Sequence, residues 1–120
     1  MELMVVEDDE AITELIVRTL TSAGYGVLTA GDGVEALALL RDHKPVGMLL
    51  DVNMPRMDGF TLLQEIKANA AIRAMPVLML TAQTAPEDIR RGIKLGAHDF
   101  IGKPFEPRQL LRRVSRMLAA

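Results

Sequence analysis

Residues 46–66 read VGMLLDVNMPRMDGFTLLQEI, and this stretch decides the fold class. Val46–Leu50 is a short apolar run that stops at Asp51, as expected of a strand that is covered on both faces. After a loop, the apolar side chains recur at a spacing of three, at Phe60, Leu63 and Ile66. This spacing is typical of an amphipathic helix, so the stretch predicts a strand followed by a helix.

The same alternation extends over the whole chain of 120 residues. We expect further strands at Leu3–Val6, Tyr25–Thr29, Val77–Leu80 and His98–Ile101. The segments between them have helical spacing, at Ile12, Leu15, Ile16 and Leu20, at Val34, Leu37 and Leu40, at Ile89 and Ile93, and at Leu110, Val114, Met117 and Leu118. Five strand and helix pairs predict one α/β domain over residues 1–120, with a parallel sheet covered by helices.

Local signals mark where these helices begin and end. Helix starts are expected at the acids Asp9 and Asp58, at Asp32 and Thr84, each three residues before a glutamate, and at Pro107. Gly24 and Gly96 are placed to end the first and fourth helices in a left-handed conformation.

Composition excludes several classes of protein. The chain has no cysteine, which rules out disulfides and thiolate metal sites. Its 16 acids against 14 lysines and arginines argue against direct nucleic-acid binding, which needs a basic surface. No apolar run approaches the roughly 20 residues of a membrane span, and Glu2 stands where a signal peptide carries basic residues. We therefore expect a cytoplasmic domain without membrane contact.

Polar residues gather where the predicted strands end. Glu7 and Asp8 follow the first strand, Asp51 and Asn53 the third, Thr81 the fourth and Lys103 the fifth. The carboxyl ends of parallel strands form the binding crevice of an open α/β sheet, so these groups are expected to converge. Clustered carboxylates repel one another unless a cation neutralises them, which predicts a Mg²⁺ or Mn²⁺ site. The acids in the first turn exclude a dinucleotide site, because they would repel a pyrophosphate.

The motifs VVEDD, LLDVNMPRMDG, LTA and KPF, in this order, resemble the bacterial response-regulator receiver domain over the whole chain. The resemblance implies a doubly wound, flavodoxin-like (βα)5 fold with strand order 2-1-3-4-5, similar to chemotaxis receivers. It implies that Asp51 accepts a phosphoryl group from a histidine kinase or phosphotransfer protein. It also implies Mg²⁺ ligation by Asp8, Asp51 and the backbone carbonyl of Asn53, with Glu7 acting through water.

The remaining roles also follow from the resemblance. Thr81 and Lys103 match groups that contact the phosphoryl oxygens, and the Lys103–Pro104 peptide is expected to be cis. Thr81 and Phe100 match the switch residues that link phosphorylation to an output surface on the fourth helix, fifth strand and fifth helix. That surface would bind an output partner or a second copy. The charges of this sequence add that a symmetric dimer could pair Glu87, Asp88 and Asp99 of one copy with Arg108, Arg112 and Arg116 of the other.

Two other functions compete with this interpretation. A Mg²⁺-dependent phosphohydrolase also uses an aspartate nucleophile, but its usual D-x-D motif needs a carboxylate where this chain has Asn53. An interaction module that works without phosphorylation would keep only the fold, and the presence of Asp8, Asp51, Thr81 and Lys103 together argues against it. We therefore expect a phosphorylated signalling domain that is not an enzyme in its own right.

Overall fold

The computed structural model describes residues 1–82 and 86–119. Strands and helices alternate along the chain without exception within these residues. The strands are β1 (Glu2–Val6), β2 (Gly26–Ala30), β3 (Gly47–Asp51), β4 (Val77–Thr81) and β5 (Asp99–Gly102). The helices are α1 (Glu10–Ser22), α2 (Gly33–Leu39), α3 (Gly59–Ala68), α4 (Pro86–Leu95) and α5 (Pro107–Ala119).

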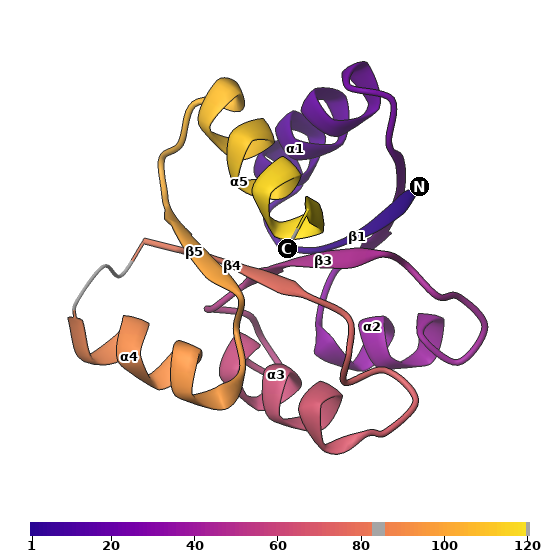
Figure 1. Ribbon diagram of the computed structural model, residues 1–120, viewed down its shortest axis with the longest axis vertical. Coiled ribbons are helices and arrows are strands. Elements are labelled where there is room, and N and C mark those ends of the chain that lie inside the picture. Colours follow the sequence, from indigo (N-terminus) through magenta and orange to yellow (C-terminus); the bar gives the residue numbers. More distant parts are fainter. Residues whose placement is uncertain (83–85, 120) are drawn as a thin grey trace.

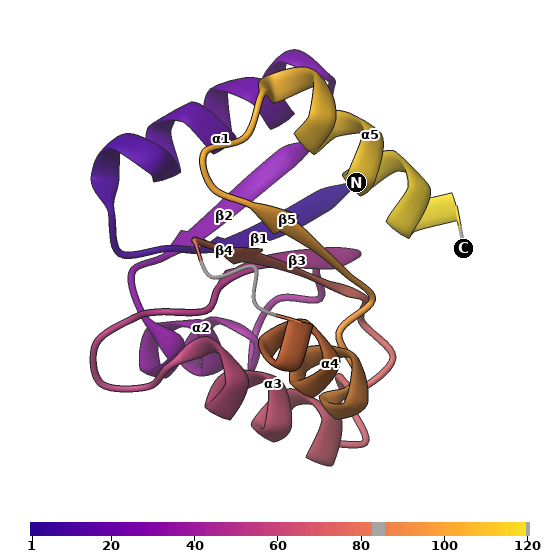
Figure 2. The same cartoon turned by 90° about the vertical axis from the view of Figure 1, so that its left-hand side faces the viewer.

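The sheet has the order β2-β1-β3-β4-β5, and every neighbouring pair of strands is parallel. Helices α1 and α5 cover one face of the sheet, whereas α2, α3 and α4 cover the other (Figures 1 and 2). The fold class, the layers and the strand order expected from the sequence are confirmed. Because all strands are parallel, their carboxyl ends lie along one edge of the sheet.

The core has two halves, one on each face of the sheet. Successive side chains of a strand point to opposite faces. In β1, Leu3 and Val5 pack toward α1 and α5, and Met4 and Val6 pack into the opposite half. This alternation explains why the central strands are uninterrupted apolar runs, since both faces of the sheet are buried.

The predicted strand boundaries are close to the observed ones, but four of the five strands end one residue later than predicted. The polar residues at these ends still pair across the sheet, as Asp51 does with Leu80 and Thr81 does with Gly102. Apolar patterning misses them because it stops at the last hydrophobic side chain. Asp51 and Thr81 are therefore anchored within the sheet ladder itself.

Most of the predicted helix signals are confirmed. Asp9, Asp32 and Asp58 cap α1, α2 and α3 through their side-chain oxygens, and Gly24 and Gly96 have φ angles of 93° and 107°. The expected cap at Thr84 lies outside the described residues.

Three residues assigned to apolar helix faces are exposed: Leu15 by 40%, Val34 by 45% and Ile93 by 50%. In α4 the buried position is Gly92, beside Ile93, because the ring of Phe100 occupies the space under the helix. Of the helices in the described ranges, none has the length and apolarity needed to cross a membrane.

Candidate functional site

Three carboxylates meet at the carboxyl edge of the sheet, as the sequence predicted. One oxygen each from Glu7, Asp8 and Asp51 lies within 4.8 Å of the other two. Glu7 and Asp51 are buried, while Asp8 is exposed at the mouth of the cluster. Two neighbouring strands supply these groups, because β1 pairs directly with β3.

Lys103 follows β5, two strands away from β3, and its side chain reaches back to the acidic cluster. Its Nζ donates to Glu7 Oε1 at 2.6 Å and to Asp51 Oδ1 at 3.0 Å, and its own side chain is only 16% exposed. The backbone N–H of Lys103 donates to the carbonyl of Thr81 at 2.8 Å, which ties the end of β5 to β4. The Lys103–Pro104 peptide is cis, as expected.

These contacts change the pKa values of Glu7 and Lys103. Burial and the neighbouring Asp51 raise the pKa of Glu7 to about 7, although the ammonium of Lys103 acts in the opposite direction. Burial alone would lower the pKa of Lys103, but its bonds to Glu7 and Asp51 outweigh this and the net pKa is raised. The lysine is therefore a fixed cation, and Glu7 ionises less readily than an ordinary glutamate.

The other predicted site residues lie around this cluster. The backbone N–H of Asn53 donates to Asp51 Oδ1 at 3.4 Å, so the residue proposed to offer a carbonyl already contacts the acid. Thr81 is buried and ends β4, next to β3, which ends in Asp51. All six residues of the predicted site are therefore brought to one edge of the sheet.

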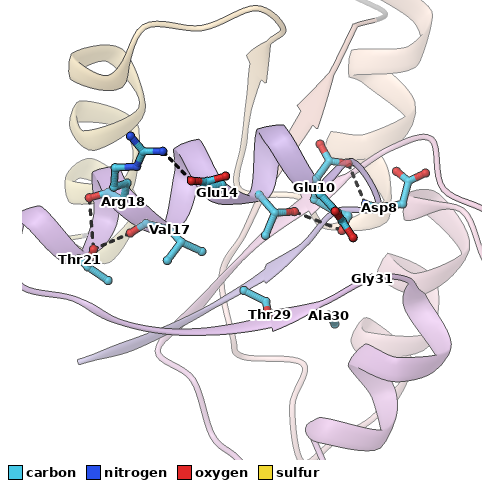
Figure 3. A pocket seen from close by; sticks show the side chains of 11 residues that line it. Asp8, Glu10, Glu14, Val17, Arg18, Thr21, Thr29, Ala30 and Gly31 are labelled. Atoms are coloured by element: carbon cyan, nitrogen blue, oxygen red, sulfur yellow. Dashed lines mark hydrogen bonds and ion pairs between the residues drawn. The ribbon is translucent and has the colours of Figure 1, made fainter.

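The cluster opens into a groove along α1 (Figure 3). The groove has a volume of about 590 Å³ and runs between α1 and the end of β2, with Glu7 and Asp8 in its wall. Figure 3 shows Asp8 at one end and the ion pair of Glu14 with Arg18, 2.8 Å long, further along the helix. Asp8 is thus reachable from solvent at the α1 side.

The donor set suits a hard divalent cation. The three side chains that could hold an ion offer carboxylate oxygens, which Mg²⁺ and Mn²⁺ prefer, and the exposed Asp8 leaves room for water ligands. Among the described residues, Lys103 is the one cation that pairs with the two buried carboxyl groups, Glu7 and Asp51. The residues present therefore fit a divalent metal at Glu7, Asp8 and Asp51.

Two glycines shape the site and were not identified from the sequence. A Cβ on Gly59 would lie 2.3 Å from the carbonyl oxygen of Asp51, and the Gly59 N–H donates to Val52 O at 2.7 Å. The start of α3 therefore packs directly on the backbone of Asp51, which only glycine permits. The sequence predicts only a helix start at Asp58, and its one signal for this close approach is the glycine immediately after that capping acid.

The second glycine is Gly92 in α4. A Cβ there would lie 2.1 Å from Cζ of Phe100, whose side chain is buried against the helix. The predicted switch residue Phe100 is thus already under α4 in this structure, in a space that Gly92 leaves open.

The surface formed by α4, β5 and α5 bears on the expected self-association. Asp99 pairs with Arg113 at 3.0 Å and lies 3.8 Å from Arg116 of the same chain, and Arg113 also donates to the carbonyl of Phe100 at 2.9 Å. Asp99 is therefore already neutralised within one copy. Pairing with arginines of a second copy stays a prediction, and it would have to exchange these contacts.

Comparison with known proteins identifies related chains. A family profile described as the response regulator receiver domain matches residues 3–115. The alkaline phosphatase synthesis transcriptional regulatory protein PhoP of Bacillus subtilis is 38% identical over 117 residues, which are 98% of this chain and 48% of that protein. Response regulator MprA of Mycobacterium avium is 37% identical over 118 residues, 98% of this chain and 51% of that protein. The chain thus spans about half the length of these relatives.

Similar solved structures are also response regulators or receiver domains. Chemotaxis response regulator CheY4 of Vibrio cholerae has a TM-score of 0.92 at 37% identity and is matched over 97% of both chains. The receiver domain of sensor histidine kinase PA1611 from Pseudomonas aeruginosa has a TM-score of 0.91 at 29% identity, over 99% of this chain and 98% of that one. That structure has a magnesium ion coordinated in the active site cleft.

Proposed function

The chain belongs to the response-regulator receiver family, whose role is to accept phosphoryl groups in two-component signalling, and we propose that Asp51 is the acceptor here. The observation that supports this assignment is the contact of Lys103 with the two buried acids of the cluster, Asp51 and Glu7. A carboxylate in this position has a fixed cation at one oxygen and potential metal ligands beside it.

The transfer places negative charge on negative charge, and the site residues reduce that repulsion. A carboxylate oxygen of Asp51 attacks the phosphorus of a phosphohistidine, the O–P bond forms as the P–N bond breaks, and the imidazole leaves with the electron pair and takes up a proton. The ammonium of Lys103, 3.0 Å from Asp51 Oδ1, is positioned to neutralise phosphoryl oxygens during this step. The hydroxyl of Thr81, at the neighbouring strand end, is the group we assign to a phosphoryl oxygen afterwards.

Glu7, Asp8, Asp51 and the backbone carbonyl of Asn53 are the residues we assign to Mg²⁺. When bound, the metal neutralises phosphoryl oxygens and lowers the barrier to in-line transfer. The acidic cluster supports this assignment, because its carboxylates otherwise repel each other and, among residues 1–82 and 86–119, have Lys103 alone as a partner cation.

We propose that the domain is a signalling switch that assists its own phosphorylation and dephosphorylation, and not a separate enzyme. A phosphohydrolase is disfavoured because Asn53 provides no second carboxylate two residues after Asp51. The donor is a histidine kinase or phosphotransfer protein, and Thr81 and Phe100 transmit the change to α4, β5 and α5. The output partner and the cytoplasmic location stay predictions.

The test is chemical phosphorylation. Incubation with acetyl phosphate and Mg²⁺ is expected to add one phosphoryl group by intact-mass analysis, labile to hydroxylamine as an acyl phosphate must be. Asp51→Asn should remain unmodified, while the matched control Asp58→Asn, which keeps a capping side chain, should be modified like the parent. Full modification of Asp51→Asn would overturn the assignment.

A further inference from the structure

The loop between β3 and α3, residues 52–58, contains an unusual backbone conformation at Arg56. Its φ is 65°, the only positive φ at a non-glycine residue among the described ranges. The left-handed region is disfavoured for any residue with a Cβ, so the surrounding contacts must stabilise it. The loop follows Asp51 directly and contains Asn53, whose N–H contacts the Asp51 carboxylate.

An ion pair with Asp32 provides that stabilisation. Nε of Arg56 donates to Asp32 Oδ2 at 3.0 Å, and Nη2 donates to the same oxygen. The other oxygen, Oδ1, accepts from the backbone N–H of Glu35 at 2.8 Å and so caps α2. One carboxylate therefore joins the start of α2 to a loop 24 residues further along the chain.

A second contact supports the same junction. A Cβ on Gly33, the first residue of α2, would lie 2.8 Å from Sδ of Met57, so the helix start and the loop are in direct contact. The hydrogen bonds that Asp32 accepts from the backbone N–H of Glu35 and from Arg56 also lower the pKa of Asp32, which keeps its carboxylate ionised. Asp32 is only 13% exposed at its side chain although it lies at the surface, whereas Arg56 is 61% exposed.

We propose that Arg56 is a positioning residue for the phosphorylation site, acting through its ion pair with Asp32 to fix the loop that orients Asn53 and the Asp51 carboxylate. The inference rests on the proposed function, because it assigns the loop to Mg²⁺ and phosphoryl binding. Neither Arg56 nor Asp32 touches the reacting atoms. Their effect passes through the backbone from residue 56 to residue 53 and from there to Asp51 Oδ1.

The test uses two variants that separate an effect on the position of the loop from a long-range effect of charge. Arg56→Gly accepts the same φ without strain and removes the ion pair. Asp32→Asn removes the negative charge, while asparagine still caps α2. If only long-range charge mattered, losing the cation would tighten Mg²⁺ binding and losing the anion would weaken it. If the pair positions the loop, both variants weaken Mg²⁺ binding.

We expect each variant to raise the Mg²⁺ dissociation constant about tenfold in calorimetric titration, the low end of the effect of residues that orient metal ligands. Combining the two should give no larger loss than either alone, because they remove the same contact. In metal-free protein, the Asn53 amide should exchange hydrogen faster in both variants. The matched control Arg73→Gly, an exposed loop arginine before β4, should leave all three measurements unchanged.

The outcomes distinguish the inference from the function. If Arg56→Gly binds Mg²⁺ as tightly as the parent or more tightly, the positioning role is wrong even though the site functions. An unchanged Asn53 exchange rate would equally contradict it. If the parent itself neither binds Mg²⁺ nor accepts a phosphoryl group, the proposed function fails first.

Discussion

Replacing Gly92 by alanine tests whether the predicted switch residue Phe100 depends on the space under α4. The new Cβ would lie 2.1 Å from Cζ and 2.7 Å from Cε1 of the ring, whereas ordinary contacts begin at 3.4 Å. The ring must therefore shift by more than about 1 Å or leave its buried position. Since Phe100 is only 9% exposed, either response disturbs packed core.

Two opposing effects set the change in the free energy of unfolding of Gly92→Ala. Alanine is preferred to glycine inside a helix by about 1 kcal/mol, which would stabilise the variant. Overpacking a buried site costs about 1–3 kcal/mol. We expect Gly92→Ala to lower the free energy of unfolding by up to about 2 kcal/mol, the overpacking cost outweighing the helix preference.

Urea unfolding followed by circular dichroism measures this difference, and a second background gives the control. In Phe100→Ala the ring is absent, so Gly92→Ala should there stabilise the protein by about 1 kcal/mol. The reversal of sign identifies the ring as the cause. A Gly92→Ala variant that is more stable than the parent in both backgrounds would refute the reasoning.

Three further outcomes follow from the site. Asp8→Ala should be more stable than the parent without Mg²⁺, by up to about 1 kcal/mol for carboxylates within 4.8 Å, and should gain less stability from added Mg²⁺ in thermal melts. Because the pKa of Glu7 is raised to about 7 in the folded protein, protonated Glu7 stabilises the fold, and this stabilisation is lost as the pH rises through 7. The metal-free parent should therefore lose stability between pH 5 and pH 8 relative to Glu7→Gln in urea unfolding. Parallel pH profiles of the two proteins would contradict this. Beryllofluoride, a phosphoryl mimic, should increase the sedimentation coefficient if the α4, β5 and α5 surface self-associates; a monomer in both states would leave a different protein as the reader.

The sheet and the position of the site were predictable because they follow from patterns within single segments. Short apolar runs specify strands buried on both faces, and parallel pairing brings their ends to one edge. Knowing only that Glu7, Asp51 and Lys103 each follow a strand was therefore enough to place them together. The resemblance to receivers added the assignment of individual roles.

Contacts between distant segments were not predictable in this way. The pairing of Asp32 with Arg56, the approach of Gly59 to the Asp51 carbonyl and the fit of Gly92 to Phe100 depend on distances between separate elements. A glycine in the sequence does not reveal whether it serves a turn or a close approach, and only packing decides this. The same limit explains Ile93, which has the right periodicity for a buried residue and is half exposed.

The central claim is that Asp51, and no other acid of the cluster, receives the phosphoryl group. Borohydride reduces an aspartyl phosphate to homoserine, so it marks the modified residue permanently. After treatment with acetyl phosphate and Mg²⁺, reduction and digestion, peptide mass spectrometry should find homoserine at position 51. Homoserine at position 8 or 9, or none in a protein that has gained a phosphoryl group, would contradict the account.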